Sequence, residues 1–399
     1  MKRAISGLLL AAGLAALISC SGSPAATAPA EVASKEAVKA QATVGQSTSE
    51  QPSSAASTVK GTPGKFARIE DLKVLRESPS AALLPDGRVL VMGGRTRAGG
   101  YWLQYEQSAE AFDFATGKWS LINDMNGKRA DAASIVLKDG RILVAGGEGP
   151  QNIPITSAEL YDPATGAWTP TGPMNNARDL TDAVLLQDGR VLLAGGRSET
   201  LGLDSSVEIY DPQTGQWTLV APMAEARMDH TTTLLQDGRV LVTGGGKVDG
   251  PYLKSAEAYD PATDTWSPAG EMSQSRAAHT AVLLNDGRVL VVGGRGKRLS
   301  ADIWDPATNS FTATGSTSVA RADHSMTLLP DGRVIVIGGA GNRDSSEIWD
   351  PATGQWTMGP TMEIARYNHG AVVLADGRIV VVGGNSAEGM TISAEIYTP

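Results

Sequence analysis

The chain has 399 residues, 41% of them hydrophobic, which is enough apolar material to bury a sizeable core. Its formal net charge at pH 7 is −9, and an acidic balance of this kind argues against nucleic acid as a partner. The single cysteine, Cys20, excludes a disulfide within one chain.

Residues 1–19 have the pattern of a signal peptide. A short basic start precedes an apolar run that is too short for a comfortable membrane span. The run ends in Leu-Ile-Ser-Cys, which resembles the lipobox of bacterial lipoproteins. That resemblance implies cleavage before Cys20 and lipidation of this residue, so the expected location is the bacterial cell envelope, with the lipid anchor as the only membrane contact. A stray cysteine in an ordinary secretory signal is the alternative.

Residues 20–62 are dominated by Ala, Ser, Thr, Pro and Gln, and this composition predicts a flexible tether behind the lipidated cysteine. Loss of Lys2 and Arg3 with the signal takes the net charge from −9 to −11. Ser21 after the cysteine resembles the outer-membrane sorting signal of Gram-negative lipoproteins. The folded part is then expected to face the periplasm or the exterior.

Residues 63–399 repeat one pattern seven times, and constant spacing at several positions is the signature of a repeat architecture. Asp-Gly-Arg recurs at Asp86, Asp139, Asp188, Asp237, Asp286, Asp331 and Asp376. A Gly-Gly pair begins seven residues after each of these aspartates, and an aromatic residue stands twenty residues before each. Ten residues before each stands an arginine: Arg76, Arg129, Arg178, Arg227, Arg276, Arg321 and Arg366. Each unit also carries an acid after the glycine pair: Glu110, Glu159, Glu208, Glu257, Asp302, Glu347 and Glu395.

One unit, Arg227 to Met272, predicts four short strands. The segments His230–Gln236 and Arg239–Thr243 are rich in Leu and β-branched residues and are joined by a two-residue Asp-Gly turn. The third strand is expected at Ala256–Tyr259 and the fourth around Trp266. Four antiparallel strands that recur every 45 to 53 residues predict propeller blades, because one small sheet can bury its faces only against neighbouring sheets.

The double glycine, the Glu-x-Tyr of the third strand and the tryptophan of the fourth resemble the kelch repeat across residues 63–399. This resemblance implies an all-β fold, a seven-bladed β-propeller of kelch type. The sequence stops after a third strand, whereas residues 63–72 align with a fourth strand through Phe66. The N-terminal strand is therefore expected to complete the last blade and to remove an open sheet edge.

Loop length varies at one place in the unit, between the glycine pair and the third-strand acid, where the gaps are 16, 12, 12, 12, 8, 8 and 11 residues. Variable loops on a rigid scaffold are the expected ligand face. Exposed aromatics beside arginines could stack on a sugar or anchor a protein, although the first loop could instead fold its aromatics onto the neighbouring blade. The candidates are Arg95, Arg97, Tyr101, Trp102 and Tyr105 in the first loop, and Arg197, Tyr252 and Arg295 elsewhere.

The seven repeat arginines favour a structural interpretation. Each is expected to pair with a third-strand acid inside its blade, and the alternative is a ring of arginines that binds an anion at the channel mouth. The four histidines share one repeat position and are expected to be structural too: His230, His279, His324 and His369.

No catalytic set, metal site or cofactor site is predicted. Kelch propellers include galactose oxidase, but its copper site needs a cysteine cross-linked to a tyrosine, and Cys20 lies in the signal. The family also includes the bacterial sialic acid (N-acetylneuraminate) epimerase, whose site would have to be built here from Arg95, Arg197 and Glu148. The expected function is a monomeric scaffold that binds a protein or glycan at the cell envelope; a sugar-modifying enzyme is the alternative.

Overall fold

A computed structural model describes most of the repeat region. The chain divides into Met1–Lys39 and Ala40–Pro399, and every described residue belongs to the second unit. The expected signal peptide, Cys20 and tether lie outside the described residues, as do Tyr101 and Trp102. The described ranges are 64–97, 103–198, 202–246, 251–296, 298–340 and 344–399.

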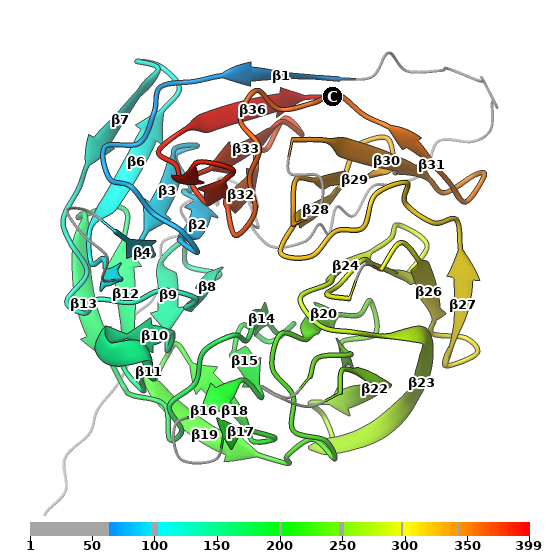
Figure 1. The fold of residues 1–399 in the computed structure, drawn as a ribbon. Helices are drawn as coiled ribbons and strands as arrows, with labels where there is room; N and C mark the ends of the chain where they lie inside the picture. The colour runs from blue at the N-terminus through cyan, green and yellow to red at the C-terminus, as the bar shows by residue number, and fades with distance from the viewer. Residues whose placement is uncertain (1–63, 98–102, 199–201, 247–250, 297, 341–343) are drawn as a thin grey trace, which may run out of the picture. The chain divides into compact units, whose positions relative to one another are not determined.

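Seven four-stranded antiparallel sheets follow one another around a central channel in the part of the chain that the structure describes (Figure 1). The predicted all-β, seven-bladed propeller is confirmed. From the inner strand outward, blade one is β2 (Ser80–Leu83), β3 (Val89–Met92), β6 (Ala109–Asp113) and β7 (Lys118–Leu121). Blade two is β8 (Ala133–Val136), β9 (Ile142–Ala145), β12 (Ala158–Asp162) and β13 (Ala167–Thr171). Blade three is β14 (Ala183–Leu185), β15 (Val191–Ala194), β18 (Val207–Asp211) and β19 (Gln216–Val220).

The remaining blades keep the same strand order. Blade four is β20 (Thr231–Leu234), β21 (Val240–Thr243), β22 (Leu253–Asp260) and β23 (Thr265–Arg276). Blade five is β24 (Thr280–Leu283), β25 (Val289–Val292), β26 (Ala301–Asp305) and β27 (Ser310–Thr314). Blade six is β28 (Ser325–Leu328), β29 (Val334–Ile337), β30 (Ser346–Asp350) and β31 (Gln355–Met358). Blade seven is β32 (Gly370–Val373), β33 (Ile379–Val382), β36 (Ala394–Thr398) and β1 (Lys65–Arg68).

Blade seven is assembled from both ends of the described chain. The N-terminal strand β1 pairs antiparallel with β36, with Phe66 opposite Tyr397 and Arg68 opposite Glu395. The rings of Phe66 and Tyr397 lie 5.2 Å apart, in the place that a tryptophan or phenylalanine of the fourth strand and its third-strand partner occupy in other blades. The expected closure by the N-terminal strand is therefore formed.

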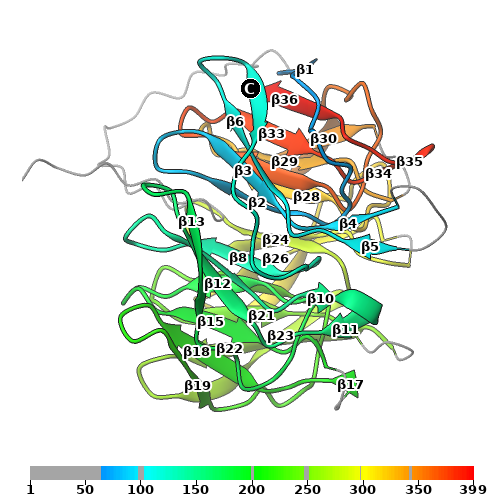
Figure 2. The same ribbon diagram turned by 90° about the vertical axis from the view of Figure 1, so that its left-hand side faces the viewer.

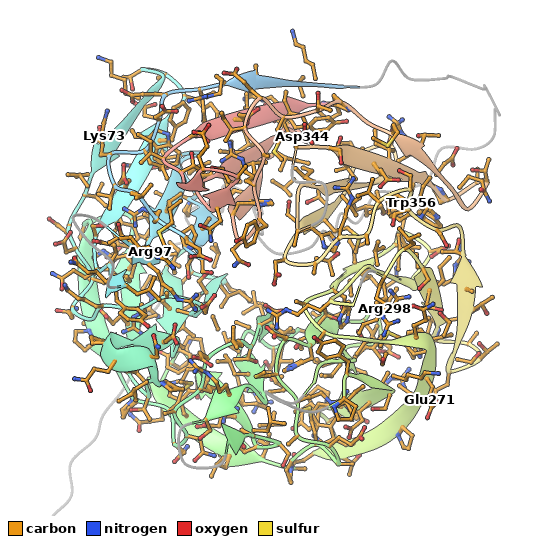
Figure 3. All side chains as sticks on the ribbon, in the orientation of Figure 1. Lys73, Arg97, Glu271, Arg298, Asp344 and Trp356 are labelled. Carbon is orange, nitrogen blue, oxygen red and sulfur yellow. The ribbon has the colours of Figure 1, made fainter. Side chains whose placement is uncertain are left out.

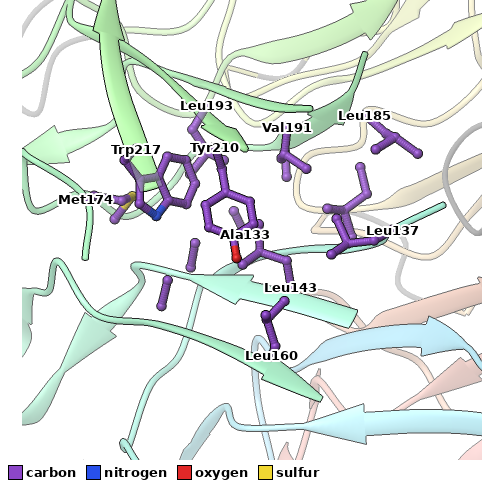
Figure 4. Packing of buried hydrophobic residues seen from close by; sticks show 14 residues of the cluster. Ala133, Leu137, Leu143, Leu160, Met174, Leu185, Val191, Leu193, Tyr210 and Trp217 are labelled. Atoms are coloured by element: carbon purple, nitrogen blue, oxygen red, sulfur yellow. The ribbon is translucent and has the colours of Figure 1, made fainter. Parts of the chain in front are cut away.

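The core lies between neighbouring blades. In each blade, the second strand from the channel is a run of four apolar or small residues that are all buried. They are buried because the neighbouring blades cover both faces of this strand. Between blades two and three, Leu143 of β9 and Leu160 of β12 pack in one cluster with Val191 of β15, Tyr210 of β18 and Trp217 of β19 (Figure 4).

The Asp-Gly-Arg turn is built the same way in every blade. In blade one, the Asp86 carboxylate accepts hydrogen bonds from the backbone N–H of Arg88 at 3.0 Å and from its Nε at 2.8 Å. Gly87 between them has a φ of 88°, a conformation that glycine adopts without a steric cost. These turns gather at one end of the propeller and differ little among blades.

The opposite end carries the connections between second and third strands. Figure 2 shows short hairpins that project from this side of the ring, and they occur in blades one, two, three and seven. They are β4 (Arg95–Thr96) with β5 (Gln104–Tyr105), β10 (Glu148–Gly149) with β11 (Ile153–Pro154), β16 (Arg197–Ser198) with β17 (Gly202–Leu203), and β34 (Asn385–Ser386) with β35 (Gly389–Met390). A 3-10 turn at Pro150–Asn152 joins β10 to β11. Within the described ranges, no helix has the length and apolarity needed to cross a membrane.

Candidate functional site at the channel mouth

All seven repeat arginines are buried and form the expected ion pair with the third-strand acid of their own blade. The distances between arginine Nη2 and carboxylate oxygen are 2.6–3.1 Å. In blade four, Arg227 also donates from Nη1 to the carbonyl oxygens of Gly244 at 2.6 Å and Ser255 at 3.1 Å. The Nη groups of these arginines are engaged inside the blade, which favours the structural interpretation over an anion site at the channel mouth.

A second ring of residues surrounds the channel at the same end. Its members stand two positions after each repeat arginine, and each has a left-handed backbone with φ between 48° and 54°. Backbone N–H groups of six members donate to the carbonyl oxygen of the member in an adjacent blade at 2.8–3.3 Å. We call this the mouth ring: Ser78, Asp131, Leu180, Asp229, Ala278, Asp323 and Asn368.

The variable loops reach this ring directly. In six blades the residue after the repeat arginine forms a β-bridge with the residue after the glycine pair, as in Ala130 with Glu148 and Asp179 with Arg197. In blade five the backbone N–H of Arg295 donates to the carbonyl oxygen of Ala277 at 2.9 Å. A cavity of about 240 Å³ lies inside the mouth ring. Its polar lining includes Asp131, Thr181, Asp182, Asp229, His230 and Asp323.

Two of the predicted arginines meet at one carboxylate. Arg95 donates from Nε to Glu148 at 2.8 Å and also pairs with Asp131. Arg197 donates to the other oxygen of Glu148 at 2.7 Å and pairs with Asp179, to which its Nε donates at 3.0 Å. Glu148 therefore joins the loops of blades one and three, and the side chains of Arg95, Glu148 and Arg197 converge.

The third predicted arginine, Arg295, forms ion pairs elsewhere on the mouth ring. Arg295 pairs with Asp229 at 2.6 Å and with Asp323 at 3.3 Å, so it spans two members of the mouth ring. Its side chain is 41% exposed. We call Arg95, Arg197 and Arg295 the mouth arginines, because each directly follows a glycine pair and pairs with carboxylates of the mouth.

Burial makes several carboxyls of the mouth weak acids. It raises the pKa of Asp131 to about 6, although the nearby Arg95 guanidinium lowers it. The side chain of Asp182 is exposed to the channel, but partial desolvation by the channel wall still raises its pKa to about 6, and the neighbouring Asp229 carboxylate raises it further. The pKa values of Asp179 and Asp323 are raised by burial as well, against the opposing effect of their arginine partners. Asp131 and Asp182, with pKa values of about 6, can exchange protons near neutral pH.

Three of the four histidines connect neighbouring blades by hydrogen bonds. Each of three forms a hydrogen bond from Nε2 to a hydroxyl of the preceding blade: His279 to Thr243 at 3.0 Å, His324 to Thr280 at 2.8 Å, and His369 to Ser325 at 2.9 Å. Burial lowers the pKa of His324 and His369 to about 3, so these rings are neutral at physiological pH.

The expectation of an exposed Tyr105 was wrong. Its side chain is only 5% exposed, and its hydroxyl donates to Asn152 in the hairpin of blade two. This loop aromatic packs onto the neighbouring blade, the alternative left open by the sequence. Tyr252 is half-buried and lies against Gly246, where an added Cβ would come within 2.7 Å of its ring. Arg97 is exposed beside β4 (Figure 3) and is available to a ligand.

Sequence reasoning missed the carboxylates of the mouth. Asp131, Asp179, Asp229 and Asp323 stand one or two positions after a repeat arginine, and Asp182 stands four after one. The available clue was that these positions differ from blade to blade while their neighbours stay constant. Part of the Asp and Asn enrichment has a backbone cause, because both residue types tolerate the left-handed conformation of the mouth ring.

Among solved structures, a fungal alcohol oxidase of the AA5 family, determined in complex with copper, is similar to this chain at 21% identity. The match covers 85% of this chain and 77% of that one with a TM-score of 0.66, so the likeness concerns the fold. In the described ranges no group of three or more His, Cys, Asp or Glu side chains could hold a metal ion. Cys20, the sole cysteine of the sequence, lies outside the described residues.

Family models match the repeat itself. No curated protein matches the chain. The kelch motif model matches residues 78–126, which is blade one up to the start of the next unit. The KLHDC2/KLHL20/DRC7 Kelch-repeats domain model matches residues 135–339 and, in a second alignment, residues 181–384. Each of these alignments covers about half of the sequence, and together they extend over blades two to seven, so the chain belongs to the kelch-repeat family.

Proposed function

We propose that this protein is a glycan-binding propeller of the bacterial cell envelope whose ligand sits at the channel mouth on the variable-loop end. One observation carries the proposal: carboxylates from several blades line the cavity of about 240 Å³, and Arg95 and Arg295 from the loops pair with three of them. The Asp-Gly-Arg end, in contrast, presents the same turn in every blade and offers nothing that would select a ligand.

The size and polarity of the cavity favour a sugar over a protein patch. Pockets for drug-sized molecules measure about 300–1,000 Å³ and are mostly apolar, whereas this one is smaller and lined largely by carboxylate, hydroxyl and imidazole groups. A protein partner would need about 800 Å² of complementary surface on each side. Arg97 and, by the sequence prediction, Trp102 would extend the site beyond the cavity. Trp102 would supply a stacking face for a sugar ring.

The test compares two exposed arginines at opposite ends of the propeller. Arg97→Ala should weaken binding of the ligand found on a glycan array by about tenfold, as expected for a contact residue. Arg190→Ala, in the Asp-Gly-Arg turn of blade three, should leave binding unchanged. Equal loss in both variants, or binding of a protein in place of any glycan, would contradict the proposal.

A sugar-modifying enzyme is the second candidate, and the convergence of Arg95, Glu148 and Arg197 favours it. In that function the arginines hold an anionic sugar, and Asp131, with its pKa raised to about 6, serves as the proton-exchanging group. Incubation of N-acetylneuraminate with the protein, followed by NMR of its stereoisomers, tests this activity. Turnover that survives in Glu148→Gln would rule out this triad as the site.

The lipid anchor is a separate part of the proposal and rests on Cys20. The protein is proposed to be a monomer held by this lipid in the envelope, in the outer membrane if the cell is Gram-negative. Its propeller would face the periplasm or the exterior. Cys20→Ala should release the protein from the membrane fraction or block its processing. Unchanged membrane association of this variant would remove the anchor from the proposal.

A further inference from the structure

His230 departs from the other histidines. It lines the channel cavity and is only 4% exposed, yet neither ring nitrogen has a hydrogen-bond partner among the described residues. The carbonyl oxygens of Arg227 and Ala194 lie near the ring but outside hydrogen-bond geometry, and the latter accepts from Thr181 at 2.6 Å. A buried imidazole without a partner is costly, which makes this ring available to a ligand.

The reason for the difference is one residue in the preceding blade. Thr280 and Ser325, which face His324 and His369, stand at the first position of β24 and β28. In blade three the matching position, directly before β14, is Asp182. No hydrogen bond joins Asp182 to His230 in the described structure.

The mouth also holds more negative than positive charge. The three mouth arginines are shared by five carboxylates: Asp131, Glu148, Asp179, Asp229 and Asp323. Asp182 adds a sixth, and none of the ion pairs in the described part of the chain involves it. The charged group that faces it is another carboxylate, Asp229. A cationic ligand would relieve this repulsion, whereas an anion would add to it.

We propose that this cavity binds the protonated primary amine of a small ligand, held by the Asp182 carboxylate and the unpartnered imidazole of His230. The inference rests on the channel mouth being the binding site, as proposed above, and names the chemical group of the ligand that this site recognises.

The donor and acceptor count fits an ammonium group. An ammonium has three N–H donors and no acceptor. Asp182 and Asp229 offer carboxylate oxygens, and the neutral ring of His230 offers one unprotonated nitrogen. Burial and the nearby Arg227 charge lower the pKa of His230 to about 3, so the ring keeps this acceptor at neutral pH. Charge-assisted hydrogen bonds of this kind are short and strong, which suits a cavity of limited size.

Three probes test the inference by calorimetric titration of the full-length protein at pH 7. Glucosamine should bind at least about tenfold more tightly than N-acetylglucosamine, since acetylation removes the positive charge and two donors. Ethanolamine distinguishes the source of the amine: equal affinity means that the amine alone is read, and weaker affinity means that the sugar ring contributes. Equal binding of glucosamine and N-acetylglucosamine would overturn the inference and leave the glycan proposal standing. Binding of ethanolamine without either sugar would keep the inference and contradict the glycan proposal, and no binding of either amine would overturn the inference.

Two substitutions place the amine. Asp182→Asn should reduce glucosamine affinity by at least about tenfold, because it removes the charge and keeps the shape. The matched control Asp139→Asn, in the turn of blade two at the other end, should not change it. Asp182→Thr places at this position the residue type of Thr280, which forms a hydrogen bond with His324. The new hydroxyl gives His230 a partner, so this variant should fold well. Retention of wild-type glucosamine affinity in either Asp182 variant would overturn the inference.

Discussion

Arg227 and Arg295 both pair with carboxylates near the channel, but in different settings. Arg227 is fully buried, and its place in the blade recurs seven times, each time with an ion pair from Nη2 to a third-strand acid. Arg295 is 41% exposed, bridges two blades, and has a counterpart in only two others. The difference teaches that chemistry repeated in every blade serves the fold. Chemistry that breaks the repeat, at the residues after the glycine pair and after the repeat arginine, is where a ligand can be distinguished.

The largest effect is expected from the repeat set. Arg227→Ala leaves Glu257 buried without its partner and should lower the free energy of unfolding by about 3–5 kcal/mol. Urea unfolding measures this change. Arg190→Ala, which removes an exposed turn arginine, should change it by less than about 1 kcal/mol. If Arg227→Ala leaves the free energy of unfolding unchanged but abolishes ligand binding, the repeat arginines form the ligand site and their structural role is contradicted.

The second largest effect is expected in the pH dependence of the free energy of unfolding, to which the buried repeat histidines contribute. Burial lowers the pKa of His324 from 6.5 to about 3 in the folded protein. The unfolded chain therefore takes up a proton below pH 6.5 while the folded chain does not until about pH 3, so this part of the stability is complete above pH 6.5 and is lost as the pH falls. His324→Gln should make the fall shallower by about 1.4 kcal/mol per pH unit. Urea unfolding at pH 7, 6 and 5 gives the slope.

The carboxyls of the mouth provide a control, because their contribution to the free energy of unfolding depends on pH in the opposite direction. The pKa of Asp131 is raised from 3.8 to about 6, so its contribution to stability is present below pH 3.8 and is lost as the pH rises through 6. Asp131→Asn should therefore steepen the loss of stability in acid, where His324→Gln makes it shallower. Parallel slopes for the two variants would contradict the assignment.

A smaller effect tests which loop aromatic belongs to the fold. Tyr105→Phe removes the hydrogen bond to Asn152 and should cost about 1 kcal/mol of unfolding free energy. Trp102→Ala, from the same loop in the sequence, is predicted from the sequence to leave the melting temperature within a few degrees. Thermal unfolding of both variants decides this, and the reverse ranking would make Trp102 the packed residue.

The smallest change in stability is expected at a mouth arginine. Arg295→Gln should alter the free energy of unfolding by less than about 1 kcal/mol, because the pair is partly exposed and screened. It should also raise glucosamine affinity a few-fold, because Asp229 loses its competing cation. Calorimetry and urea unfolding together check both parts, and a weaker affinity would show that the arginine itself contacts the ligand.

The repeat made most of the fold predictable. Seven glycine pairs and seven Asp-Gly-Arg turns placed the blades, and the register of Phe66 located the closing strand. The arginine and acid spacing also indicated the buried pairs. Each of these features is local or periodic, so one unit could be checked against the next.

The candidate site was only partly predictable. Arg95, Arg197 and Arg295 stood out because they lie in loops of unequal length, but their acidic partners belong to other segments of the chain. Pairing of Arg95 with Asp131, or of Arg295 with both Asp229 and Asp323, depends on how neighbouring blades meet around the channel. The failure at Tyr105 has the same origin, since Asn152 reaches it from the next blade.

The pairing of β1 with β36 has a consequence for the kinetics of folding. The other blades join strands that are close in sequence, whereas this pair joins segments from opposite ends of the described chain, so its loop-closure entropy exceeds that of every other strand pair among the described residues. Blade seven is therefore expected to assemble last. Until it does, β36 presents a free edge, and the open ring is the species most exposed to proteases and to intermolecular strand addition.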